Sequence, residues 1–186
     1  MTRVVVVPSP PGLLPELAGL EDPLAEARAA ALDACRWLAA EQAPVVVLGA
    51  DDLALRVGRH LLSTTHTGPV DAVRLPDVPS LDHLDALLVV ADGSARRGEK
   101  APGHLDERAA AYDEGIGRAL ASGDAAALAA LDADLGAELL AAGVPALSVM
   151  GSLFEGRSVA AETTYADDPF GVAYWVTRWT VTREVA

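Results

Sequence analysis

The chain has 186 residues, of which 51% are hydrophobic and 4% aromatic, and its formal net charge at pH 7 is −13. This length favours one domain with a substantial core, which must be filled by Ala, Val and Leu because aromatic residues are scarce. The negative charge argues against nucleic acid as a partner, since no basic cluster offsets the repulsion. No apolar run approaches the length of a membrane span, so we expect a cytoplasmic protein with no membrane partner.

The first half of the chain alternates between apolar runs and helical patterns. Four consecutive valines within residues 3–7 predict a strand that is buried on both faces of a sheet. Asp22 and Pro23 are typical of a helix start, and the single cysteine, Cys35, is expected to be a buried thiol in that helix. The strands expected in this half are residues 3–7, 45–48, 70–75 and 86–91. The helices expected between them are residues 23–42 and 53–62.

The second half is predicted to be helical and then to end in two strands. The helices expected here are residues 104–122, 125–131, a segment from Asp132 or Asp134 to Gly143, and 145–154. Two runs with β character, residues 158–165 and 172–181, are joined by a turn at 167–171 and predict an antiparallel hairpin. We therefore expect residues 1–186 to form a single three-layer α/β/α domain, with a mainly parallel central sheet and an antiparallel C-terminal hairpin.

Three segments, taken in order, resemble a known family. They are VPSPPGLLPEL at 7–17, ADGSARRGEKAPGHLDERAAAYDEGIGRALASGDAAALAALD at 91–132, and DDPFGVAYWV at 167–176. Together they resemble the catalytic B-subunit-like proteins of the class III extradiol ring-cleavage dioxygenases, and the related AmmeMemoRadiSam system protein B. Active members of that family hold a non-haem Fe(II) through two histidines and a carboxylate, and a further histidine acts as acid–base catalyst. The resemblance implies Fe(II) or another divalent metal as cofactor if the activity is retained.

The chain departs from the family at the positions of these histidines. Ser9 follows the first strand where the family has its first histidine, and Gly49-Ala50 stand where the second commonly follows the next strand. Ala95 occupies the histidine position of the middle motif. We therefore expect no bound metal and a diverged, non-catalytic member of the family, a pseudoenzyme. Its expected role is to bind a small anionic or aromatic ligand, or a protein partner.

The alternative is an active metal-dependent extradiol (catechol) dioxygenase with a rearranged metal site. His66 lies in the polar segment STTHTG and is the histidine best placed to reach a ligand, with Asp51, Asp92 or Glu162 as further metal ligands. No two histidines have the i, i+4 spacing of a helical metal site. The other three are expected at the surface or near helix starts: His60, His83 and His104.

The segment after the strand at 86–91 contains most of the candidate ligand-binding residues. Ligands in open α/β sheets bind just outside the carboxyl ends of strands. The candidates are Ser9, Asp92, Gly93, Ser94, Arg96 and Arg97. Backbone N–H groups and the two guanidinium groups could hold a carboxylate or a phosphate. Alternatively, the arginines pair with acids such as Asp92, Glu99, Asp106 or Glu107 and fix the loop.

Ser94 and His66 are the candidate catalytic residues. A hydrolytic protein could use Ser94 as a nucleophile, but the GxSxG motif is absent, and a turn hydrogen bond is the alternative role. In the terminal hairpin, Asp167 and Asp168 are either site residues or part of a solvated turn. Phe170, Tyr174 and Trp175 are expected to supply aromatic packing, and exposed apolar residues on the hairpin suggest a homodimer.

Overall fold

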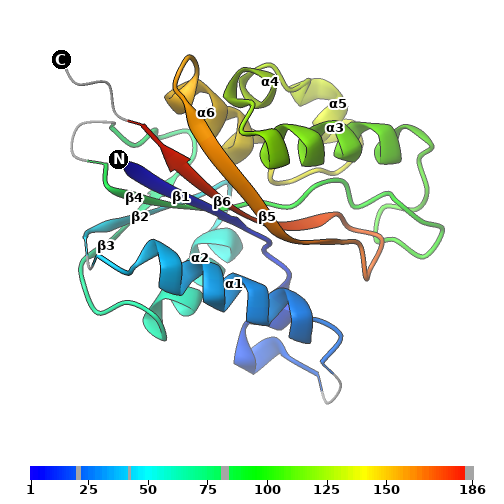
Figure 1. Ribbon diagram of the computed structural model, residues 1–186. Coiled ribbons are helices and arrows are strands. Elements are labelled where there is room, and N and C mark those ends of the chain that lie inside the picture. Colours follow the sequence, from blue (N-terminus) through cyan, green and yellow to red (C-terminus); the bar gives the residue numbers. More distant parts are fainter. Residues whose placement is uncertain (20–21, 42, 81–83, 183–186) are drawn as a thin grey trace.

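A six-stranded mixed sheet runs through the part of the chain that the computed structural model describes, residues 1–19, 22–41, 43–80 and 84–182 (Figure 1). The strand order is β3-β2-β4-β1-β6-β5. The first four strands in this order are parallel, and β6 and β5 are antiparallel to their neighbours. The strands are β1 (Thr2–Val7), β2 (Val45–Gly49), β3 (Val70–Arg74), β4 (Ala86–Val90), β5 (Val159–Asp167) and β6 (Tyr174–Val181). The predicted α/β class is confirmed.

Helices cover both faces of this sheet. In Figure 1, α1 and α2 lie on one face, and α3 to α6 lie on the other. The helices are α1 (Ala25–Leu38), α2 (Asp52–Ser63), α3 (Arg108–Ser122), α4 (Ala125–Ala129), α5 (Ala133–Glu138) and α6 (Val144–Phe154), and two short 3-10 helices follow β1, η1 (Pro11–Leu13) and η2 (Pro15–Leu17). The three layers follow from the sequence, because the central strands are apolar on both faces and both faces need cover.

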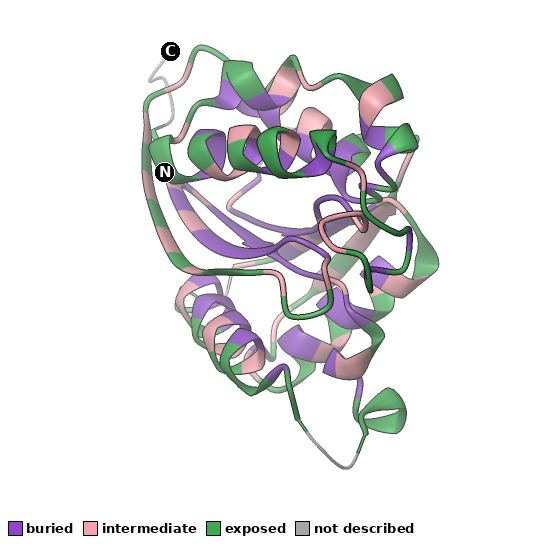
Figure 2. Cartoon of the chain, turned by 90° about the vertical axis from the view of Figure 1, so that its right-hand side faces the viewer, coloured by how far each residue is buried: buried purple, intermediate pink, exposed green. Residues whose placement is uncertain are grey.

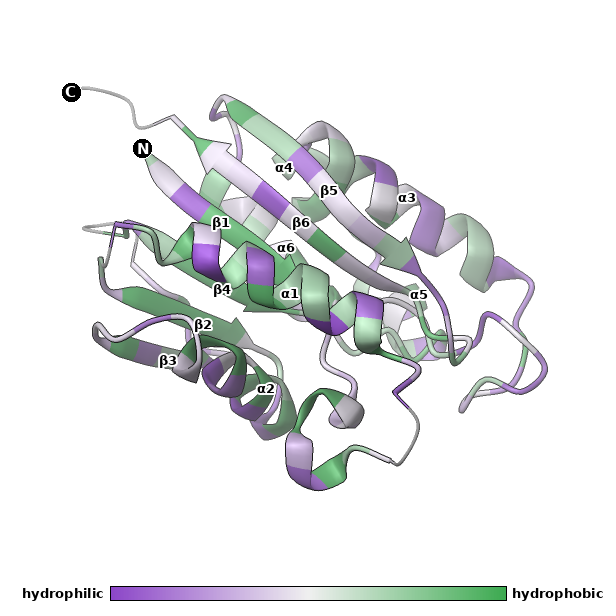
Figure 3. Cartoon of the chain, turned by 60° about the horizontal axis from the view of Figure 1, so that its bottom comes forward, coloured by the Kyte–Doolittle hydropathy of each residue, from purple (hydrophilic) through white to green (hydrophobic). Residues whose placement is uncertain are grey.

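The valine run of β1 contributes alternately to two cores. Val4 and Val6 pack into the core under α3 to α6, whereas Val5 and Val7 pack into the core under α1 and α2. The interior strands are buried over most of their length in Figure 2, and β2 and β4 are predominantly hydrophobic in Figure 3. Cys35 lies in the second core, where burial raises the pKa of its thiol to about 12. It is therefore the inert thiol that its helical context predicted.

Several predicted boundaries are wrong, and long-range hydrogen bonds explain the largest error. The helix predicted from His104 begins at Arg108, because His104 has a left-handed φ of 58° and the preceding segment is tied back as a loop. Asp106 N donates to Arg96 O at 3.0 Å, and Gly103 N donates to Ala95 O at 2.9 Å. Propensity favours helix here, but these contacts override it.

Smaller differences occur at other helix ends. The helix predicted to reach Gly143 ends at Glu138, and Leu140 has a left-handed φ of 55°. α1 begins at Ala25 and ends at Leu38, so it is shorter than predicted at both ends, and Gln42 lies outside the described residues. By contrast, Gly123 ends α3 with a φ of 71°, as predicted for a C-cap glycine.

The C-terminal hairpin forms as predicted, with β5 at the edge of the sheet. Tyr174 and Trp175 are buried, as their predicted packing role requires, whereas Phe170 is 41% exposed at the turn and lies outside the core. The exposed ring and the edge strand leave the homodimer as a prediction. No helix in the described part of the chain combines the length and the hydrophobicity that crossing a membrane requires.

Candidate functional site

The connections that follow the neighbouring parallel strands β1 and β4 lead to opposite faces of the sheet. After β1 the chain continues to α1 on one face, and after β4 it continues to α3 on the other (Figure 1). Two adjacent strands whose connections diverge in this way form a topological switch point, and ligands of open α/β sheets bind in the crevice between the diverging loops. Ser9 follows β1 and Asp92 follows β4, so both candidates lie at this point.

Ser9 and Asp92 are joined by two hydrogen bonds across the switch point. The Ser9 backbone N–H donates to Asp92 Oδ1 at 2.7 Å, and the Ser9 hydroxyl donates to Asp92 Oδ2 at 2.7 Å. Burial raises the pKa of Asp92 to about 6, the two bonds from Ser9 lower it, and the charge of Asp51 raises it. The result is a partly exposed carboxyl group that changes charge close to neutral pH, which is typical of functional sites.

Tyr174 is a further polar side chain near Asp92. Burial raises the pKa of Tyr174, and the charge of Asp92 raises it further. The side chain of Tyr174 packs into the core under α1 and α2, so this site lies on that side of the β4 exit. The Ser9–Asp92 site, meaning these two residues together with Tyr174 and Asp51, therefore consists of carboxyl and hydroxyl groups.

Gly93 and Ser94 turn the chain from this site toward α3. A Cβ atom on Gly93 would lie 2.5 Å from Trp175 Cη2 and 2.6 Å from Asp113 Oδ1, so only glycine fits here. Ser94 is fully buried, and its hydroxyl donates to Leu139 O at 2.8 Å and accepts from Arg96 N at 3.0 Å. The turn hydrogen bond is confirmed for Ser94. Its hydroxyl is not presented to a ligand, so the nucleophile hypothesis has no geometric support.

Arg96 and Arg97 are both occupied by protein groups. Arg96 donates to Gly103 O at 2.8 Å and Glu138 O at 3.0 Å, and it lies 3.8 Å from Asp106. The loop-fixing role, with Asp106 as an acidic partner, is therefore the observed one for Arg96. These contacts engage Nε and Nη1 of the guanidinium, so a binding role for Arg96 stays a prediction.

Arg97 pairs with acids that the sequence interpretation did not name as its partners. Arg97 Nε donates to Asp168 Oδ2 at 2.6 Å, and Arg97 Nη1 lies 3.4 Å from Asp113 Oδ2. Asp113 is buried, accepts a bond from Ser94 N at 2.9 Å, and has a pKa that burial raises and Arg97 lowers. A signal for Asp113 was present, because helical spacing places it on the buried stripe of α3 with Ala109, Ile116 and Leu120.

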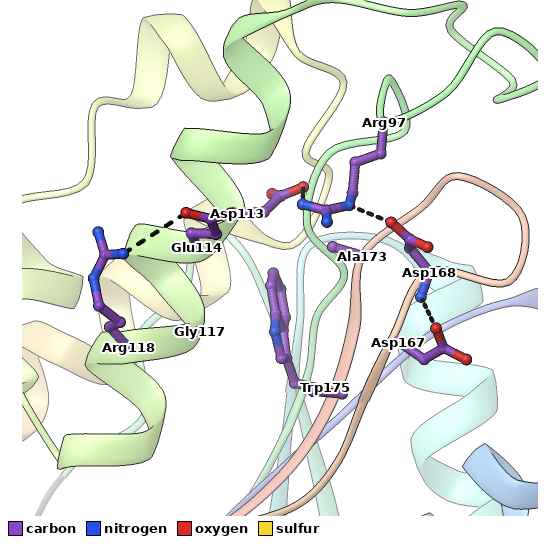
Figure 4. Close-up of a pocket in the computed structure, with 10 residues that line it drawn as sticks. Arg97, Asp113, Glu114, Gly117, Arg118, Asp167, Asp168, Ala173 and Trp175 are labelled. Carbon is purple, nitrogen blue, oxygen red and sulfur yellow. Dashed lines mark hydrogen bonds and ion pairs between the residues drawn. The ribbon is translucent and has the colours of Figure 1, made fainter.

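A cavity of about 320 Å³ opens beside this network, between α3 and the start of β6 (Figure 4). We call it the Trp175 pocket. Its lining residues come from α3, the β4 exit loop and the ends of the hairpin strands: Arg97, Asp113, Glu114, Gly117, Arg118, Ala166, Asp167, Asp168, Ala173 and Trp175. Asp167 and Asp168 are therefore not only a solvated turn, since both line a cavity.

The residues suggested for a rearranged metal site do not come together. His66 Nε2 is 3.4 Å from Pro69 O, which accepts from Val45 N at the amino end of β2. Asp51 and Asp92 lie at the carboxyl ends of strands, so the length of a five-residue strand, about 16 Å, separates them from His66. Glu162 lies on β5 opposite Arg178, and β6 and β1 separate it from β4. The prediction of one site from these residues is wrong.

The described residues hold no cluster of metal ligands elsewhere either. Among them, no three His, Cys, Asp or Glu side chains are grouped closely enough to hold a metal ion. His83 lies outside the described residues.

Comparisons with known proteins add no family assignment. No protein-family model matches the chain, and a search of curated proteins found no similar sequence. The resemblance to extradiol dioxygenases thus rests on the three sequence segments alone and stays a prediction.

Proposed function

We propose that this protein is a diverged, non-catalytic member of the extradiol dioxygenase B-subunit-like family that binds a small hydroxylated aromatic compound at the Ser9–Asp92 site. The observation that carries the proposal is the pair of 2.7 Å hydrogen bonds between Ser9 and Asp92 at the β1/β4 switch point. Ser9 stands where the resembling family has a metal-ligating histidine. The position at which the family would hold a metal-bound catechol therefore carries hydrogen-bonding groups in this chain.

The charges at this site favour a phenol over an anion. Asp92 and Asp51 are acidic, and the nearby arginines Arg96 and Arg97 are bound to protein groups elsewhere. Each carboxylate oxygen of Asp92 accepts one bond from Ser9 and keeps a lone pair, so it can accept a second bond from a phenolic hydroxyl. A carboxylate-bearing ligand would meet like charge at the same place.

Ligand binding can be tested with two compounds that differ in one carboxylate, catechol and 3,4-dihydroxybenzoate. We expect catechol to bind more tightly in isothermal titration calorimetry, with an affinity that rises between about pH 5 and about pH 7 as Asp92 ionises. Asp92→Asn should weaken catechol binding by tenfold or more, because a charge-assisted hydrogen bond contributes about 1.5–3 kcal/mol. Glu162→Gln, on the distant edge strand, is the matched control and should leave the affinity unchanged.

Metal content and turnover test the non-catalytic part of the proposal. Protein purified without chelators should contain iron far below one atom per chain by elemental analysis. Oxygen uptake with added Fe(II) and catechol should not exceed the rate without protein. Stoichiometric iron, or catechol-dependent oxygen uptake, would overturn the non-catalytic assignment, and tighter binding of the benzoate would overturn the ligand class.

A further inference from the structure

The Trp175 pocket lies on the other side of the β4 exit loop from the Ser9–Asp92 site. Trp175 packs into the core under α3 to α6, whereas Tyr174, its neighbour in β6, packs into the opposite core. Successive residues of a strand point to opposite faces of the sheet, so the two sites are separated by the sheet itself. A ligand of the Trp175 pocket would therefore be independent of the proposed phenol site.

The charged groups around this pocket favour a cation. Its lining includes four carboxylates and two guanidinium groups, which leaves a negative balance when all of them are ionised. Arg97 is held between Asp113 and Asp168 (Figure 4). Asp167 uses one carboxylate oxygen for the backbone N–H of Asp168 and keeps the other free of any hydrogen bond to the described residues.

The indole of Trp175 offers the pocket a hydrogen-bond donor. Trp175 is 6% exposed, yet no atom of the described residues accepts a hydrogen bond from its Nε1. By contrast, the neighbouring buried indole of Trp179 donates to Leu120 O at 2.7 Å. The Trp175 Nε1–H is therefore a donor that opens to the cavity rather than one sealed in the core, and an acceptor on a ligand can replace water as its partner.

The absence of a side chain at Gly117 leaves room beside the Trp175 Nε1–H. Trp175 Nε1 faces α3 at Gly117, where an added Cβ atom would lie only 3.2 Å from it (Figure 4). Gly115, two residues earlier in the same helix, has no heavy atom within 4 Å of an added Cβ. Glycine lowers helix stability by up to about 1 kcal/mol relative to alanine. At position 117 it keeps the wall of the cavity open beside the indole.

We propose that the Trp175 pocket binds a small organic ammonium compound that also carries a hydrogen-bond acceptor. The ammonium group lies against the carboxylates of Glu114, Asp167 and Asp168 and near the indole ring, where carboxylate attraction and cation–π attraction act together. The acceptor, a hydroxyl or carbonyl oxygen, receives the Trp175 Nε1–H. The cavity of about 320 Å³ is at the lower end of the range for small-molecule sites, so the ligand is small.

The proposal can be tested with three probes that share a phenyl ring and a hydroxyl group but carry no phenol. They are 2-amino-1-phenylethanol, which is cationic, 1-phenylethanol, which is neutral, and mandelate, which is anionic. The indole N–H signals in a proton–nitrogen correlation spectrum report binding, with the Trp175 signal assigned from Trp175→Phe. We expect the amine at millimolar concentration to shift the Trp175 signal in a saturable manner while the Trp179 signal stays in place.

Two glycine variants of α3 form the matched pair. Gly117→Ala should weaken amine binding by tenfold or more because its Cβ narrows the cavity beside Nε1, whereas Gly115→Ala should leave the affinity unchanged. Both substitutions favour the helix equally, so a difference between them does not come from helix propensity. Equal thermal unfolding midpoints of the two variants establish that both are folded.

The outcomes separate this proposal from the proposed function. Absence of a Trp175 shift with the amine, an equal shift with mandelate, or equal effects of the two glycine variants would each overturn the ammonium site. None of these results bears on catechol binding, which depends on Asp92 and is unaffected by Gly117→Ala if the two sites are separate. Conversely, Asp92→Asn should abolish the preference for catechol and leave the Trp175 signal responsive to the amine.

Discussion

The carboxyl groups on the two sides of the β4 exit loop have different kinds of partner. On the side of α1 and α2, Asp92 is held by the neutral donor groups of Ser9 and lies near the like charge of Asp51, so its pKa rises to about 6. On the side of α3, Asp113 and Asp168 share the guanidinium group of Arg97. The first arrangement leaves a carboxyl group free to change its charge, and the second fixes the loop to α3 and to the hairpin turn.

The largest losses of unfolding free energy are expected for alanine substitutions at Gly143 and Gly93, which lie against or within the β4 exit loop. A Cβ atom on Gly143 would lie 2.3 Å from Asp92 N, and one on Gly93 would lie 2.5 Å from Trp175 Cη2. Each alanine variant should lose about 3 kcal/mol of unfolding free energy in urea titrations, at the upper end of typical overpacking costs. Gly143→Ala should disturb catechol binding more, and Gly93→Ala should disturb amine binding more. Equal loss of both ligands in both variants would contradict independent sites.

Removing the guanidinium group of Arg97 should have the next largest effect. Arg97→Met leaves the buried Asp113 without its cation, and we expect a loss of about 2 kcal/mol at pH 7. The loss should shrink as the pH falls, because burial raises the pKa of Asp113 and its protonation leaves no charge unpaired in the variant. Arg118→Met is the control, since that exposed arginine makes only a 3.9 Å pair with Glu114, and its effect should stay within about 0.5 kcal/mol. A pH-independent loss in Arg97→Met would show that packing, not charge, is what Arg97 contributes.

Replacing Asp92 should change the unfolding free energy with the opposite pH dependence to replacing Arg97. Its folded-state pKa of about 6 lies above the ordinary value of 3.8, so ionisation is disfavoured in the folded state, and the protein loses stability as pH rises from about 4 through about 6. Asp92→Asn removes this penalty. The unfolding free energy of the variant relative to the wild type should therefore be about 1–2 kcal/mol more favourable at pH 7.5 than at pH 4, a value reduced because Asp92 is partly exposed. Asp71→Asn, on the exposed edge strand β3, is the control. A pH-independent difference between Asp92→Asn and the wild type would contradict the raised pKa.

The smallest effect is expected for Ser9→Ala. The variant loses the hydroxyl bond to Asp92 Oδ2 and keeps the backbone bond to Oδ1, which should cost about 1 kcal/mol or less at pH 7. Because both bonds favour the ionised carboxyl group, the pKa of Asp92 should rise further in a carbon-detected NMR titration. Ser63→Ala, whose hydroxyl donates only to His60 O, should leave that pKa unchanged. An unchanged or lower pKa in Ser9→Ala would contradict the electrostatic account of this site.

Much of the fold could be predicted because its signals are local. The valine run of β1 indicated burial on both faces, Asp51 caps α2 through a bond from Ala54 N at 2.8 Å, and Gly123 ends α3 in the left-handed conformation. The position of the candidate site also followed from the sequence, because the carboxyl ends of parallel strands share one edge of a sheet. Ser9 and Asp92 were both named in advance, although nothing local indicated that they touch.

The sequence by itself determined the layered α/β architecture, since strand and helix periods, caps and turns depend on neighbours a few residues apart. Only the tertiary structure decided what the polar groups do. Ser9 and Asp92 are 83 residues apart, and Arg97 and Asp168 are 71 residues apart, so no local pattern encodes either pair. The sheet order brings the first pair to the switch point and the hairpin brings the second to the loop. The first contact helps to set the pKa of Asp92, the second engages Arg97, and the same fold leaves the Trp175 indole facing a cavity.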